Sequence, residues 1–209
     1  TLSAVLFLSL LVYGENEYHK FAGKDALWNI LTTGKMGYPY EWQTKYTLGD
    51  SVEFKGIKYL EVISEVNWSR RAIGGLREDT LTKKIYFYDY YQEVVLYDFS
   101  LNVGDTIFYG KESANPQSIY YKVVDSIGTI NLNGELRKKW SLTTSIYNMK
   151  DIWIEGIGSV GRFGLLNPIE PYLTTDASST YFGCFKYGNL FYFNRQATNS
   201  EDCPCSSRS

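Results

Sequence analysis

Residues 151–160 read Asp-Ile-Trp-Ile-Glu-Gly-Ile-Gly-Ser-Val, and their pattern indicates how the chain is built. Ile152 and Ile154 alternate with Trp153 and Glu155, so an extended strand would place the isoleucines on one face and the Trp–Glu pair on the other. We therefore predict a strand here. If the Trp153 face is the core, the Glu155 carboxylate must be paired, because a lone buried charge costs several kcal/mol. The predicted partners are Arg77, Arg137 or Arg162, and we expect Glu155→Gln to lower stability more than any activity.

Four glycines follow the strand: Gly156, Gly158, Gly161 and Gly164. Glycine supplies the positive φ angles that bulges and sharp turns require, and this spacing interrupts regular pairing. We predict that the strand ends in a glycine corner with a packing role. A loop that cradles phosphate is disfavoured, because neither Lys-Ser/Thr nor a switch from strand to helix follows.

Two hairpins flank this region. Asn133-Gly134 separates apolar runs at 119–127 and 135–142, and Asn-Gly accepts the type I′ turn of a two-residue hairpin. Gly188-Asn189 separates runs at 181–187 and 190–193 in the same way.

The N-terminal half repeats this pattern of short runs and turns. Residues 25–32 fit either one helical turn capped by Asp25 or a strand through Trp28 and Ile30, and the strand is favoured. Further strands are predicted at 45–48, 51–54, 57–66, 84–91 and 93–99, with turns at Gly49-Asp50 and Lys55-Gly56 and a loop at 70–75. The chain is therefore predicted to be all-β, a single antiparallel domain forming a curved sheet, barrel or sandwich from a meander of hairpins.

Residues 2–12 form an uncharged apolar run that is too short to span a bilayer as a helix. With small residues at Val12 and Gly14, we interpret residues 1–14 as part of a signal peptide and residues 15–209 as one secreted β domain with a cysteine-containing tail. No other segment is apolar enough to cross a membrane. The net charge of −2 favours neither nucleic acid nor an anionic membrane surface as a partner.

A set of motifs recurs in a defined order along residues 28–205. These motifs are Gly49-Asp-Ser51, Leu76-Arg-Glu-Asp79, Val95-Leu-Tyr-Asp-Phe-Ser-Leu-Asn-Val-Gly-Asp-Thr106, Val124-Asp-Ser-Ile127, Asn133-Gly-Glu-Leu-Arg137, Trp153-Ile-Glu-Gly-Ile-Gly-Ser159, Gly164-Leu-Leu166 and Cys184-Phe185. In this order the chain resembles uncharacterised secreted proteins of Bacteroidota, many of which end in a type IX secretion sorting domain. The resemblance implies a β-rich fold and an exported protein of the periplasm, cell surface or extracellular space, with no catalytic or binding residues to carry over. The chain departs from the pattern at Gly161-Arg-Phe163, and it reaches Ser209 without a sorting domain.

The chain offers little for catalysis. His19 is the only histidine and lies near the expected mature N-terminus, where we expect it to be an ordinary exposed residue. A Ser-His-Asp or Cys-His site and a multi-histidine zinc site are therefore improbable, and we predict no enzyme activity, metal or cofactor. Two carboxylates could still hydrolyse a glycan, and the candidates are Glu78, Asp79, Asp98, Asp105 and Glu155. Two of these acids, Asp79 and Asp105, precede Thr at the predicted head of a strand, as Asp50 and Asp125 precede Ser, and aspartate is a common turn former there.

Tyr86, Tyr88 and Tyr90 share one face of a predicted strand. A solvent-facing row of tyrosines would be a platform for a glycan, a peptide or a partner protein, whereas ordinary packing would bury it. We expect a non-catalytic binding module of unknown oligomeric state. The alternatives are a carboxylate-dependent glycan hydrolase and an apolar-ligand carrier. Two carboxyl groups about 5–10 Å apart in a cleft would favour the hydrolase, and a deep apolar pocket would favour the carrier.

Two covalent modifications are also predicted. The tripeptides that begin at Asp50, Asp79, Asp105 and Asp125 match the Asp-Ser/Thr-apolar sequence that Bacteroidota O-glycosylate, so the resemblance makes Ser51, Thr80, Thr106 and Ser126 candidate sites. Turn-forming aspartates before strands would produce the same tripeptide. In an oxidising compartment, a disulfide from Cys184 to Cys203 or Cys205 would hold the tail. The resemblance favours Cys203.

Overall fold

The computed structural model describes residues 17–34, 40–109, 120–145, 148–162, 164–169 and 179–193. The predicted signal peptide at residues 1–14 and the tail cysteines Cys203 and Cys205 lie outside these ranges.

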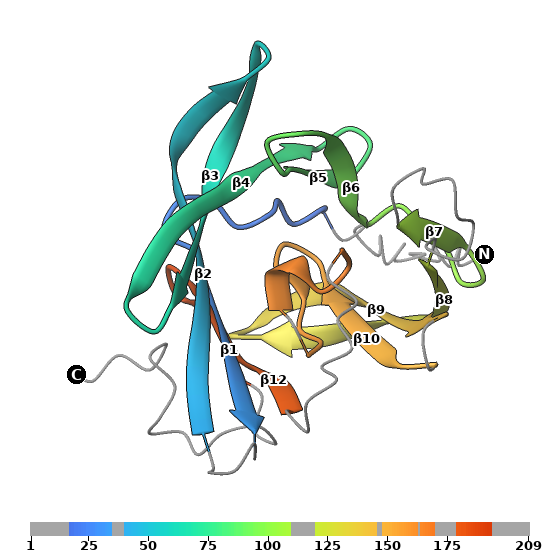
Figure 1. Ribbon diagram of the computed structural model, residues 1–209. Coiled ribbons are helices and arrows are strands. Elements are labelled where there is room, and N and C mark those ends of the chain that lie inside the picture. Colours follow the sequence, from blue (N-terminus) through green and yellow to red (C-terminus); the bar gives the residue numbers. More distant parts are fainter. Residues whose placement is uncertain are drawn as a thin grey trace, which may run out of the picture.

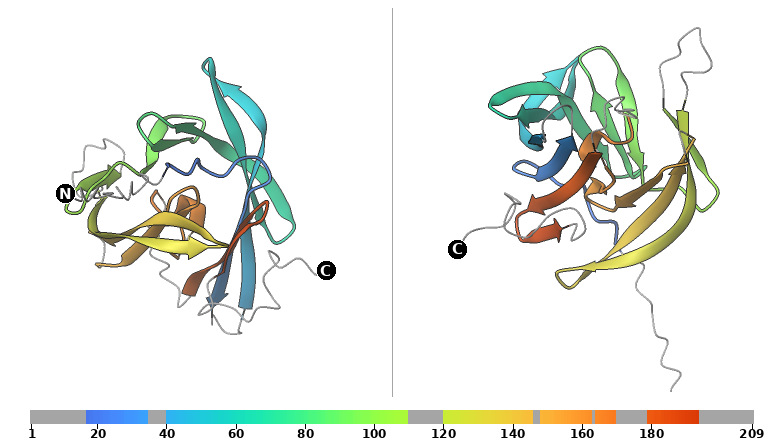
Figure 2. Two further views of the ribbon diagram at one scale, coloured as in Figure 1. Left: turned by 180° about the vertical axis from the view of Figure 1, so that it is seen from behind. Right: turned by 60° about the horizontal axis from the view of Figure 1, so that its bottom comes forward.

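Two antiparallel sheets make up the described fold, as predicted (Figure 1). The eight-stranded sheet has the order β13-β12-β1-β2-β3-β4-β5-β6, and the five-stranded sheet has the order β11-β10-β9-β8-β7. The strands of the first sheet are β1 (Leu27–Gly34), β2 (Tyr40–Phe54), β3 (Ile57–Val66), β4 (Ser69–Asp79), β5 (Lys84–Tyr88), β6 (Glu93–Asp98), β12 (Ser179–Tyr187) and β13 (Leu190–Phe193). Those of the second are β7 (Thr106–Tyr109), β8 (Tyr120–Leu132), β9 (Glu135–Thr144), β10 (Lys150–Ile154) and β11 (Gly158–Ser159). Both sheets curl as half-barrels, and the long β8–β9 hairpin is strongly curved (Figure 2).

The described ranges contain one short 3₁₀ helix, η2 (Gly164–Leu166), and otherwise strands and turns. No helix among them is long and apolar enough to cross a membrane.

The predicted hairpin turns are confirmed. Asn133 and Gly134 have φ angles of 53° and 91°, as a type I′ turn requires, and they join β8 to β9. Gly188, with a φ of 55°, lies in the turn between β12 and β13. The Lys55-Gly56 turn joins β2 to β3 as expected.

Two predicted breaks are wrong, because both lie within strands. Gly49-Asp50 forms a bulge in the 15-residue strand β2, where the pairing with β3 shifts between Leu48 and Ser51. The predicted loop at 70–75 belongs to β4. Gly74 is needed there for close packing, because a Cβ atom would lie 2.2 Å from the Tyr88 carbonyl oxygen.

The core between the sheets is aromatic. Trp28, Trp140 and Trp153 are buried, and the Trp153 ring meets Tyr97 edge-to-face with centroids 5.2 Å apart. The predicted glycine corner is confirmed, since β10 ends before Gly156 and Gly158, which have φ angles of 78° and 90°. A Cβ atom at Gly158 would lie 2.7 Å from the Tyr97 ring. The corner therefore brings backbone against the central aromatic cluster.

Residues 17–26 cross between the two sheets as an extended segment, which we call the N-terminal strap (Figure 1). The Phe21 ring stacks on Trp28 and Tyr97 at centroid distances of 6.0 and 5.9 Å. The Ala22 amide donates a hydrogen bond to the Gly156 carbonyl at 2.9 Å. The strap therefore ties the first strand to the glycine corner of the opposite sheet.

Candidate functional site

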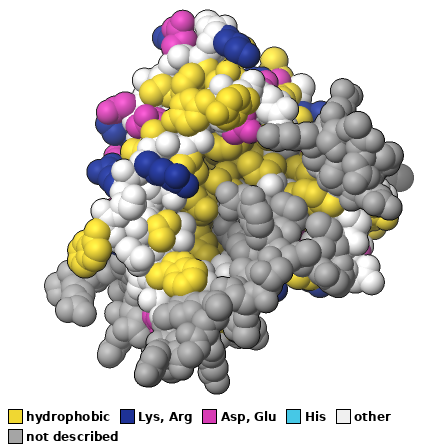
Figure 3. Space-filling model, viewed as in Figure 1, with side chains coloured by type: hydrophobic (Ala, Val, Ile, Leu, Met, Phe, Trp, Pro, Cys, Tyr) yellow, Lys and Arg dark blue, Asp and Glu magenta, His cyan; other side chains and the backbone are white. Residues whose placement is uncertain are grey.

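The three tyrosines of the predicted platform do not form an exposed row. Tyr86 is half-buried beneath Arg77, whose guanidinium lies 3.9 Å from the ring centroid. Tyr88 is only 7% exposed, and its ring packs 5.0 Å from Phe54. Tyr90 lies beyond the end of β5, is 45% exposed and meets Phe54 edge-on. Hydrophobic side chains gather on the upper part of the face in Figure 3. The three tyrosines therefore pack against Phe54 and Arg77 and do not form the flat, exposed row that a stacking platform requires.

The candidate carboxylates have separate structural partners. Glu78 accepts hydrogen bonds from the Tyr18 hydroxyl at 2.9 Å and the Phe21 amide at 2.8 Å, which fixes the strap. Burial, followed by the charge of Glu78, raises the pKa of Tyr18 far above its usual value. Asp79 accepts from backbone amides in the β4–β5 turn, and Asp105 from the Asn102 amide in the β6–β7 loop. These contacts are typical of turn-forming aspartates.

The predictions for Glu155 and His19 need correction. Glu155 is buried, as predicted, but the basic side chain next to its carboxylate is His19, with Nδ1 3.8 Å from Oε2. Arg137 donates instead to the Glu155 backbone carbonyl at 3.1 Å and pairs with Glu135. Sequence reasoning missed this because the strap lies 136 positions before Glu155 and carries His19 into the interior. His19 is thus half-buried and not an ordinary exposed residue.

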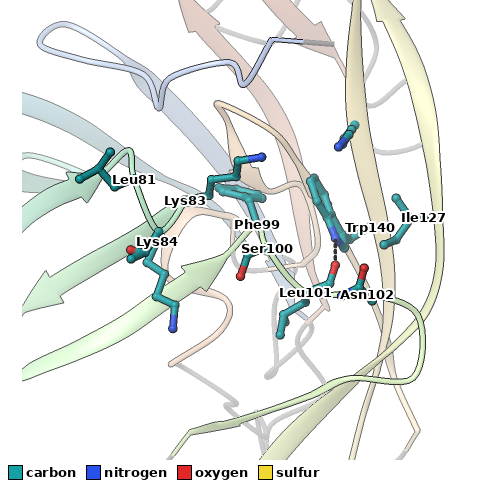
Figure 4. Close-up of a pocket in the computed structure, with 11 residues that line it drawn as sticks. Leu81, Lys83, Lys84, Phe99, Ser100, Leu101, Asn102, Ile127 and Trp140 are labelled. Atoms are coloured by element: carbon teal, nitrogen blue, oxygen red, sulfur yellow. Dashed lines mark hydrogen bonds between the residues drawn. The ribbon is translucent and has the colours of Figure 1, made fainter. Parts of the chain in front are cut away.

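The best candidate site is a cleft of about 480 Å³ between the β4–β5 turn, the β6–β7 loop and the β8–β9 hairpin (Figure 4). The volume suits a ligand of drug size. Its lining residues are Leu81, Thr82, Lys83, Lys84, Phe99, Ser100, Leu101, Asn102, Ile127, Lys138 and Trp140. The cleft brings both sheets together at one place, and its described lining includes three lysines and no acid.

The two aromatic side chains of the cleft lining are buried, so their ring faces are not accessible to a ligand. Phe99 and Trp140 are 3% and 1% exposed, with ring centroids 5.2 Å apart. Trp140 Nε1 donates to the Leu101 carbonyl at 3.1 Å, which fixes the loop over the ring (Figure 4). The accessible apolar groups are aliphatic, since Leu81 is 94% and Ile127 37% exposed. A ligand would therefore meet aliphatic side chains above a rigid aromatic base.

Polar groups lie beside this apolar surface. Asp98 accepts hydrogen bonds from the Ser100 amide at 3.0 Å and hydroxyl at 2.5 Å, and it pairs with Lys84 at 3.2 Å. Two further predicted hydrolase carboxylates contact the described lining from outside it, since Asp79 accepts from the Leu81 and Thr82 amides and Asp105 from the Asn102 amide. The arrangement offers hydrogen-bond donors and positive charge to a ligand.

No family model matches the chain, and no curated protein matches it. Among solved structures, the chain is similar to a crystal structure from Bacteroides fragilis that is described as a candidate exported protein with a YmcC-like fold. The two chains share 10% sequence identity and a TM-score of 0.36, over 81% of this chain and 99% of the other. A likeness of this degree carries no information about function.

None of the cleft residues was singled out by sequence reasoning as a ligand group, although Asp98 lies beside them. The only local signal was Lys83-Lys84, where the β4–β5 turn ends and β5 begins, and two adjacent lysines there are by themselves typical of a solvated surface. The predicted glycosylation residues Ser51, Thr80, Thr106 and Ser126 are all exposed. Cys184 is fully buried, no free cysteine occurs among the described residues, and its pairing with Cys203 stays a prediction.

Proposed function

We propose that the protein is an exported, non-catalytic module that binds a peptide segment of a partner protein in the cleft. Export rests on the signal peptide predicted at residues 1–14. The observation that supports binding is the composition of the cleft, which combines exposed aliphatic side chains with the polar groups of Ser100 and Asn102. Peptides present alternating apolar side chains and backbone polar groups, which such a surface matches.

The same composition distinguishes a peptide from the other predicted ligands. Sugars stack on exposed aromatic faces, but Phe99 and Trp140 lie almost fully below the surface. A carrier of apolar ligands needs apolar walls, whereas three lysines line this cleft. A glycan hydrolase needs two carboxylates in the cleft, and the described lining supplies none.

The test is selection of phage-displayed random peptides on the folded protein. Ile127→Trp should fill the cleft, because Ile127 pairs with Trp140 across β8 and β9 and lies beside it in the lining (Figure 4). The matched control is Val103→Trp, which adds the same ring at an exposed position that does not line the cleft. We expect the unmodified protein and the control to enrich a common peptide motif and Ile127→Trp to lose it. Equal enrichment by all three proteins, or none by any, would overturn the proposal.

A further inference from the structure

The three lysines of the cleft differ in how their charges are balanced. Lys84 lies 3.2 Å from the Asp98 carboxylate and is neutralised by it. Lys83 and Lys138 are half-buried, and within the described ranges neither forms an ion pair. Lys83 and Lys138 therefore differ from Lys84 in having no carboxylate within ion-pair distance among the described residues.

Lys83 occupies a backbone conformation that does not suit it. Its φ angle is 55°, in the left-handed region where glycine and asparagine are favoured and a long side chain is uncommon. A glycine would complete the β4–β5 turn with less strain. Residues with strained backbones cluster at functional sites, so the strain at Lys83 indicates that its side chain has a function.

The strap contacts Lys83 through an aromatic ring. Its ammonium lies 5.7 Å from the centroid of the Tyr18 ring, which attracts a cation without neutralising it. The Tyr18 ring is held in turn by its hydroxyl bond to Glu78 and by Phe99, 6.4 Å away between centroids. The ammonium group is thus positioned at the edge of the cleft by an aromatic face.

We propose that the cleft selects peptides with carboxylate side chains, with Lys83 and Lys138 as the residues that recognise them. This inference rests on the peptide-binding function proposed above. Lysine ammonium groups are compact charges with three donors, so each can donate to a single carboxylate oxygen without the planar, two-point geometry that arginine favours. Leu81 and Ile127 then contact aliphatic side chains next to the acidic residue.

The test uses two phage-displayed libraries of ten-residue peptides that differ only in their polar residues, Asp and Glu in one and Asn and Gln in the other. We expect the acidic library to be enriched on the order of tenfold over the amide library at low salt, with the advantage falling as salt rises. Lys83→Gln and Lys138→Gln should each reduce acidic enrichment several-fold. Lys58→Gln, which removes an exposed charge outside the cleft, should not.

Lys83→Gly separates binding from folding. It relieves the left-handed strain, so its thermal unfolding midpoint should equal or exceed that of the unmodified protein while acidic enrichment is lost. Equal enrichment of both libraries, with both lost in Ile127→Trp, would overturn acid selectivity and leave the peptide site standing. Enrichment of neither library would overturn both proposals. Acidic enrichment that survives Lys83→Gly and Lys138→Gln together would overturn the assignment of the two lysines.

Discussion

The Lys122 ammonium lies 2.5 Å from the Asp151 carboxylate, and both side chains are almost completely excluded from solvent. The same carboxylate accepts hydrogen bonds from Trp153 Nε1 at 2.8 Å and from the Ser159 hydroxyl at 2.6 Å. The pair therefore joins strands β8 and β10 to the end of the glycine corner. The Lys122 charge thereby balances the Asp151 charge, which would otherwise be buried without a counter-ion.

Replacing Lys122 with methionine should lower the unfolding free energy by about 3–5 kcal/mol, because Asp151 would keep its donors but lose the balancing charge. Urea unfolding at neutral pH measures this loss. The control is Lys150→Met, which breaks the exposed pair with Asp125 and should cost at most about 1 kcal/mol. Similar losses for the two variants would contradict a structural role for the buried pair.

Glu155→Gln is now expected to raise stability, by roughly 1 kcal/mol, which reverses the prediction made from the sequence. Glu155 Oε2 is buried and accepts no hydrogen bond within the described structure, and His19 is too distant to donate one at 3.8 Å. Removing the charge removes its desolvation cost. Chemical denaturation of Glu155→Gln beside the exposed control Glu53→Gln measures the effect, and a clear loss of stability in Glu155→Gln alone would refute it.

Acid should weaken the fold partly through Arg77 and Glu93. Arg77 Nε and Nη2 donate to the two Glu93 oxygens at 2.6 and 2.7 Å, and these hydrogen bonds hold the Glu93 pKa below its ordinary value of 4.5. Because the folded pKa is lowered, the contribution is complete above pH 4.5 and is lost as pH falls through the folded pKa. Glu93→Gln should cost about 1 kcal/mol at pH 7 and flatten the dependence of stability on pH below 4.5. An unchanged slope would show that the pair contributes nothing.

The predicted disulfide can be tested by peptide mapping under non-reducing conditions. Cys184 should appear linked to Cys203, and Cys203→Ser should lower the unfolding free energy by about 2–4 kcal/mol. Cys205→Ser should have little effect. A linkage from Cys184 to Cys205 would refute the choice of partner, and an unlinked Cys184 would refute the disulfide.

The exposure of Ser51, Thr80, Thr106 and Ser126 permits the predicted O-glycosylation. Glycopeptide mass spectrometry of protein from its native host should detect a sugar on at least one of them. Turn chemistry explains the tripeptide at Asp105, which lies directly before β7 and accepts from the Asn102 amide, whereas Asp50 and Asp125 lie within β2 and β8. An intact mass equal to that of the bare polypeptide would refute the glycosylation.

The sequence predicted those parts of the fold that depend on neighbouring residues. Asn133-Gly134 and Gly188-Asn189 specify hairpin turns because their backbone angles are a local property. Gly49 and Gly74 were wrongly predicted to interrupt strands, because glycine also occurs at bulges and at close contacts within a strand. Whether a glycine forms a turn, a bulge or a close contact depends on residues in neighbouring strands, here Ile63 and Tyr88. The sequence predicted the glycine corner, but it did not show that the Tyr97 ring packs against Gly158.

The candidate site was not predictable for the same reason. The cleft combines the β4–β5 turn, the β6–β7 loop and β9, and only the curl of two sheets brings them together. The ion pairing of its lysines is also a tertiary property, since Lys83 and Lys84 are adjacent in sequence but only Lys84 meets an acid within the described structure. Alternation placed Tyr86 and Tyr88 on a common face correctly, but it could not show that Arg77 and Phe54 cover them.

Strand β1 pairs with β2 on one side and with β12 on the other. Thr32 and Thr180, whose hydroxyls lie 3.3 Å apart, are separated by 148 positions along the chain. As the polypeptide emerges from a ribosome or a translocation pore, one edge of β1 therefore stays unpaired until β12 has been released. Pairing across so long a span makes folding slow and exposes that edge to other chains. The nascent protein should consequently depend on a chaperone, or on being held unfolded, until its last hairpin is released.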